Sequence, residues 1–166
     1  MSSAYSTDAW VNLMIAEAGA SAALTGLVFV AVSINLEKVL RYPSLPGRAR
    51  ESITQLFSVL VIATLCLIPN QSMAALGWQL LLLGLCQWTM TAFLQLRYVT
   101  QHRGEPWHWM GTRVLLNQLS SLPVCVAGIS LMVHSGGGLY WLVPGILFSF
   151  IAGVFHAWVL LIEILR

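Results

Sequence analysis

The chain has 166 residues, of which 58% are hydrophobic and only 8% are charged. Soluble globular domains carry about 25% charged residues, so this composition excludes an ordinary soluble domain and predicts an integral membrane protein in a lipid bilayer. The net charge of +2 comes from scattered side chains, which excludes nucleic acid as a partner.

Five segments reach or approach the length of about 20 mainly apolar residues that a membrane-spanning helix needs. We therefore predict an all-α fold, a single polytopic membrane domain over residues 1–166 that forms a bundle of about five transmembrane helices. The predicted spans are 10–36, 51–68, 73–96, 114–133 and 139–165. No basic residue precedes the first apolar run, so we expect this helix to stay in the mature protein.

The eight Lys and Arg side chains predict how the chain is oriented. They lie between the first and second predicted spans, around the connection between the third and fourth, and at the C-terminus. In a five-span chain these positions are all on one side of the membrane. The positive-inside rule makes that side cytoplasmic, so we predict an outer N-terminus and an inner C-terminus.

The first predicted span carries one acid, Glu17, inside an apolar run. A central ionisable residue costs roughly 2.5 to 3.5 kcal/mol on insertion scales, so it usually faces a protein interior or a wet cavity. At about 100° per residue, Ser21, Thr25 and Asn35 share the helix face of Glu17. We expect this polar face to point toward the interior of an assembly. In an oligomer, the Glu17 side chains of the copies could form a negatively charged ring near the outer mouth of a pore.

The opposite face of the same helix carries small residues at a spacing of seven, namely Gly19, Gly26 and Ser33. Small side chains let a neighbouring helix backbone approach closely. We therefore expect other helices to pack on this face, with the first helix central to the bundle.

His156 is the second ionisable residue that we place inside a span. At 1.5 Å per residue its depth differs from that of Glu17 by on the order of 15 Å, so the two are not expected to pair. A neutral histidine satisfied by hydrogen bonds is the more common interpretation, and a functional one is the alternative. Candidate partners at its depth are Ser58, Gln87, Thr91, Asn117 and Ser121; at the depth of Glu17 they are Gln79, Thr64 and Ser130.

Motifs for catalysis or cofactor binding are missing from the sequence: it has no GxSxG, HExxH, Walker or CxxCH pattern, and its three cysteines show no CxxC spacing. We predict neither an enzyme nor a bound cofactor. His102, Glu105 and His108 could together bind a transition metal, but their spacing fits no recognised site. The WHW segment is more typical of an interfacial anchor, so no metal site is predicted.

Two stretches resemble a group of small uncharacterised bacterial multi-pass membrane proteins: the C-terminal AWVLLIEILR and GASAALTGLVFVAVSINLEKVLRYPSLPGR, residues 19–48. The resemblance implies no function. We expect the protein in the bacterial cytoplasmic membrane.

Two hypotheses of function follow from the first helix. The leading one is a homo-oligomeric channel or transport pore, with cations as the candidate permeant species and this helix lining the path. The alternative is an accessory or assembly subunit that packs against a larger membrane protein partner and conducts nothing.

Overall fold

The computed structural model describes residues 3–42, 45–101 and 107–165, and these residues form helices joined by short turns without a strand. The α-helices are α1 (Val11–Ile34), α2 (Leu36–Arg41), α3 (Leu45–Cys66), α4 (Met73–Gln101), α5 (Trp107–Val133) and α6 (Leu142–Leu165). Three short 3₁₀ helices accompany them: η1 (Ser3–Tyr5), η2 (Asp8–Trp10) and η3 (Gly138–Trp141).

Five helical segments are long and apolar enough to cross a membrane, which confirms the all-α class and the expected number of spans. They are Asp8–Ile34, Leu45–Cys66, Met73–Arg97, Val114–Val133 and Gly138–Ile162. The orientation of the chain stays a prediction.

The second membrane-length helix begins at Leu45, although the sequence predicted a span from residue 51. Pro46 lies in its first turn, where a helix does not need the missing backbone N–H. The predicted boundary was therefore wrong by about one and a half turns. As a consequence Arg48 and Glu51 belong to α3, and both side chains are buried.

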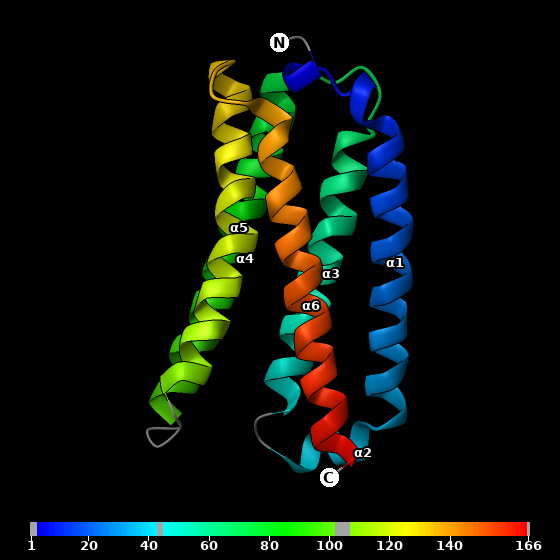
Figure 1. The fold of residues 1–166 in the computed structure, drawn as a ribbon, viewed down its shortest axis with the longest axis vertical. Coiled ribbons are helices and arrows are strands. Elements are labelled where there is room, and N and C mark those ends of the chain that lie inside the picture. The colour runs from blue at the N-terminus through cyan, green and yellow to red at the C-terminus, as the bar shows by residue number, and fades with distance from the viewer. Residues whose placement is uncertain (1–2, 43–44, 102–106, 166) are drawn as a thin grey trace.

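Helices α3, α4, α5 and α6 form a four-helix bundle, in which α4 packs on α5, α5 on α6, α6 on α3 and α3 on α4. The N-terminus and η3 lie at one end of the bundle, whereas α2 and the C-terminus lie at the other (Figure 1). We call these the η3 end and the α2 end.

Helix α1 lies outside this bundle and packs on α3, so its predicted central place is wrong (Figure 1). Its buried residues are Met14, Ser21 and Val28, a seven-residue repeat, and α1 packs mainly on α3. In a bilayer an apolar face can meet either lipid or protein, so the composition of α1 did not identify the side that packs.

Close backbone contact joins α4 to α5 toward the η3 end. A Cβ placed on Gly77 would lie 2.8 Å from the Gly128 carbonyl oxygen, and one placed on Gly128 would lie 2.7 Å from the Gly77 carbonyl oxygen. A Cβ on Gly84 would lie 2.7 Å from Cys125 Sγ. Only glycine allows this approach, which is a common way for helices to pack in membranes.

The N-terminal segment packs against the turn between α5 and α6 and hydrogen-bonds to it. Gly138 has a φ of 56°, and a Cβ on it would lie 2.1 Å from the Ala4 carbonyl oxygen. The Gly137 N–H donates to the Tyr5 hydroxyl at 3.1 Å, and the Tyr5 ring stacks on His134. The η3 end of the bundle is therefore covered by the chain itself.

The interior of the bundle differs between its two ends. Toward the η3 end lies an apolar core of buried residues: Val59, Ile62, Ala63, Cys66, Leu76, Leu80, Val124, Ala127, Leu131, Leu139, Leu142 and Ile146. From the middle of the bundle to the α2 end, many buried side chains are polar, and a smaller apolar cluster of Val39, Leu45, Ala49 and Leu160 lies near α2.

Candidate functional site

Buried polar and charged side chains gather inside α3, α4, α5 and α6 over the part of the bundle nearer to α2. We call this set the polar interior. Its members are Arg48, Glu51, Ser52, Gln55, Ser58, Gln87, Thr91, Gln95, Asn117, Ser120, Ser121, Ser149 and His156. Groups of this kind are costly to bury unless they are paired, so their concentration in one place marks the candidate site.

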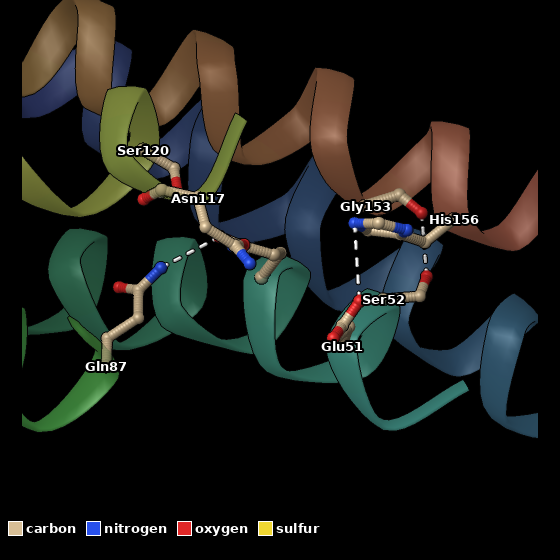
Figure 2. A network of polar contacts seen from close by, with 8 residues as sticks. Glu51, Ser52, Gln87, Asn117, Ser120, Gly153 and His156 are labelled. Carbon is tan, nitrogen blue, oxygen red and sulfur yellow. Dashed lines mark hydrogen bonds and ion pairs between the residues drawn. The ribbon is translucent and has the colours of Figure 1, made fainter. Parts of the chain in front are cut away.

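Glu51 of α3 and His156 of α6 are in contact inside the polar interior (Figure 2). His156 Nε2 lies 3.7 Å from Glu51 Oε2, and the two side chains are 0% and 1% exposed. Two groups that can each carry a proton thus meet where the protein excludes solvent. Arg48, one turn closer to the α2 end and on the same face of α3, is also buried and adds a positive charge.

A hydrogen bond between α3 and α6 fixes the register that brings the two groups together. Ser52 Oγ donates to the Gly153 carbonyl oxygen at 2.7 Å (Figure 2). Gly153 permits the approach, because a Cβ on it would lie 2.7 Å from Leu56 Cγ. Since Ser52 follows Glu51 and Gly153 precedes His156 by one turn, this contact sets the two side chains side by side.

One turn farther from the α2 end, three amide side chains join three helices. Gln87 Nε2 of α4 donates to Gln55 Oε1 of α3 at 2.8 Å. Gln55 Nε2 in turn donates to Asn117 Oδ1 of α5, across the diagonal of the bundle. We call these three residues the amide cluster. Ser120 and Ser121 both donate to the Asn117 carbonyl oxygen, at 3.0 and 2.7 Å.

His156 is buried as expected, but the sequence did not predict its contact with the carboxyl group of Glu51. The sequence predicted hydroxyl and amide partners and overlooked Glu51, which is the first residue of the predicted span 51–68. A usable signal was present: residues 48, 51, 52, 55 and 58 are polar and recur at helical spacing, which predicts one polar face on a helix that begins before residue 51.

The polar residues of α1 lie apart from the polar interior. Ser21 is buried against α3, whereas Glu17, Thr25 and Asn35 are partly exposed. Ser21 Oγ donates to the Glu17 carbonyl oxygen at 2.6 Å, and Thr25 Oγ1 to the Ser21 carbonyl oxygen at 2.7 Å. Asn35 Nδ2 donates to the carbonyl oxygen of residue 31 at 2.9 Å. The side chains of Ser21, Thr25 and Asn35 therefore donate hydrogen bonds to backbone carbonyl oxygens of their own helix.

The expected polar partners of Glu17 lie elsewhere. Thr64 is exposed and donates to the carbonyl oxygen of Leu60 at 2.8 Å. Ser130 Oγ hydrogen-bonds within the turn at the η3 end, where it accepts from the Gly138 N–H at 2.8 Å. Within the described part of the chain, no hydrogen bond joins Glu17 to these side chains or to Gln79.

The small-residue face of α1 is exposed, so the expectation that other helices of this chain pack on it is wrong. A Cβ on Gly19 or Gly26 would meet nothing within 4 Å, and Ser33 is exposed. The buried side of α1 is the opposite one. A contact of this face with another chain stays a prediction.

The residues considered for a metal site, His102, Glu105 and His108, have side chains outside the described part of the chain. Among the described residues there is no group of three His, Cys, Asp or Glu side chains that could hold a metal ion.

Comparisons with protein-family models, with curated proteins and with solved structures find no match to this chain. Its function is therefore inferred from the polar interior itself.

Proposed function

We propose that the protein is a membrane transport protein that moves protons or small cations along the polar interior. The observation that carries this proposal is the contact between Glu51 and His156, two fully buried ionisable groups inside membrane-length helices. Such groups are rare in transmembrane segments, and they commonly mark proton relays and ion pathways.

The chemistry of the pair suits a proton carrier. A carboxylate can accept a proton and an imidazole changes its charge near neutral pH, so a proton can pass between two such groups in contact. The positive charge of Arg48 can offset the charge of the carboxylate when the imidazole is neutral. The state with an ionised Glu51, a neutral His156 and a charged Arg48 thus has no net charge inside the bundle.

The proposed path is closed at the η3 end. The apolar core fills that part of the bundle with buried apolar side chains. Transport would then need these helices to move apart or the core to become hydrated, as hydrophobic gates do. The proposal is a gated transporter or channel rather than an open pore.

Two further parts of the proposal concern the surroundings. By the positive-inside rule, the α2 end with Lys38, Arg41 and Arg50 faces the cytoplasm. We also retain a homo-oligomer, in which the exposed small-residue face of α1 packs against a second copy. In this arrangement α1 supports the assembly, and the path runs through each protomer.

An accessory or assembly subunit is the second candidate function. The exposed face of α1 favours it, because Gly19 and Gly26 leave room for a helix that this chain does not supply. Purification in mild detergent separates the two: a ring of identical chains supports transport by a homo-oligomer, whereas a co-purifying membrane protein supports the accessory role.

Proton flux into proteoliposomes, followed with an internal pH-sensitive dye, tests the proposed function. Wild type should conduct, and Glu51→Gln should lower the flux by about a factor of ten or more. Glu37→Gln is the matched control, because Glu37 lies at the surface with its side chain 91% exposed. Wild-type vesicles that carry no flux, or equal flux in both variants, would contradict the proposal.

A further inference from the structure

The amide cluster and Ser149 leave three buried polar atoms without a hydrogen-bond partner among the described residues: Gln87 Oε1, Asn117 Nδ2 and Ser149 Oγ. A buried polar atom that stays unpaired costs about 1 to 3 kcal/mol. Proteins avoid this cost with ordered internal water, which typically satisfies groups that the chain itself cannot reach.

Rotating the amide groups does not remove the unpaired atoms. Each amide offers one donor group and one acceptor atom, and the three are joined by two hydrogen bonds, from Gln87 to Gln55 and from Gln55 to Asn117. Turning a single amide sets like atoms against each other. Turning all three reverses the direction of the chain but still leaves a donor at one end and an acceptor at the other.

The surroundings indicate the side from which water reaches the cluster. Beyond the cluster toward the η3 end lies the apolar core, with Val59, Leu80 and Val124 fully buried. Toward the α2 end lie the buried polar side chains of Ser52, Glu51 and His156, together with the apolar Leu56 beside Gly153. In the same direction α4 and α5 diverge from α3 and α6 (Figure 1).

We propose that the amide cluster is a water-binding site, filled from the α2 end. Water molecules accept from Asn117 Nδ2 and donate to Gln87 Oε1, and a further one hydrogen-bonds to Ser149 Oγ. The polar interior is thus a hydrated half-channel that ends at a dry apolar core. This inference does not depend on transport, although such water would extend a proton path beyond Glu51 and His156.

Silver ion, which is small, hydrated and reactive toward thiols, provides the test. In a background without the three native cysteines, single cysteines replace Ser58 and Ser149 in the polar interior, or Ala63 and Ala127 in the apolar core. All four native side chains are buried, so burial alone does not distinguish them. Each folded variant is treated with silver ion, then unfolded, and the remaining free thiol is measured by mass spectrometry.

We expect Ser58→Cys and Ser149→Cys to react at least about ten times faster than Ala63→Cys and Ala127→Cys, because silver ion travels with water. Each variant must first elute from size exclusion as the wild type does. The two positions in the polar interior are on different helices, so either one can carry the test alone. Reaction at all four positions, or at none, would overturn the inference.

Discussion

Toward the η3 end, α4 and α5 approach each other through Gly77 and Gly128, whereas toward the α2 end the same bundle is joined by Gln55, Gln87 and Asn117. The first contact depends on shape, and any larger side chain forces the backbones apart. The second depends on hydrogen-bond partners, and it leaves polar atoms that need water. One bundle thus combines a closed apolar region with a polar region. Only the polar region contains the contact between Glu51 and His156, two groups that could transfer a proton.

The largest effect is expected at the buried ionisable pair. Glu51→Leu or His156→Leu removes one partner and leaves the other buried, which typically costs about 3 to 5 kcal/mol for a buried charge pair. Replacing both should cost less than the sum of the single changes, because the two groups then vanish together. Thermal unfolding of the three variants in mild detergent measures this coupling, and strictly additive losses would show that the contact does not contribute to stability.

A smaller but still large effect is expected at the glycine contact of the apolar half. Gly128→Leu should destabilise the bundle by about 1 to 3 kcal/mol or more, since its side chain meets the backbone of α4. Gly26→Leu on α1 is the matched control, because nothing lies within 4 Å of a Cβ there. Unfolding temperature and size-exclusion profile check both. Equal damage from the two changes would mean that α1 is packed on both sides, and a change of oligomer size in Gly26→Leu alone would indicate contact with a second copy.

The smallest effect is expected at the hydrogen bond that sets the register of α3 and α6. Ser52→Ala removes the bond to Gly153 and should cost about 1 kcal/mol. Ser33→Ala is its control, since Ser33 is exposed and its hydroxyl donates to Phe29 of its own helix at 2.8 Å. That change should stay within about 0.5 kcal/mol. The reverse order of the two effects would show that Ser52 does not hold the helices together.

The five helices could be predicted from the sequence because apolar length alone determines whether a segment can cross a membrane. The side of α1 that packs on the bundle could not be predicted, because lipid and protein interior are both apolar, and Gly19 and Gly26 are compatible with either. Glu51 was missed for a different reason. Pro46 and Gly47 resemble a turn, yet a proline fits the first turn of a helix, so the acid lies inside the bundle. Its contact with His156 depends on the register of two helices distant in sequence, which composition does not encode.

We propose that the path runs through the polar interior of α3, α4, α5 and α6 and does not run along α1. The most direct test compares an acid on α1, Glu17, with an acid on α3, Glu51, by proton flux in proteoliposomes containing Glu17→Gln or Glu51→Gln. We predict near wild-type flux in Glu17→Gln and a loss of about a factor of ten or more in Glu51→Gln. Loss of flux in Glu17→Gln with retention in Glu51→Gln would contradict it and would favour a path along α1.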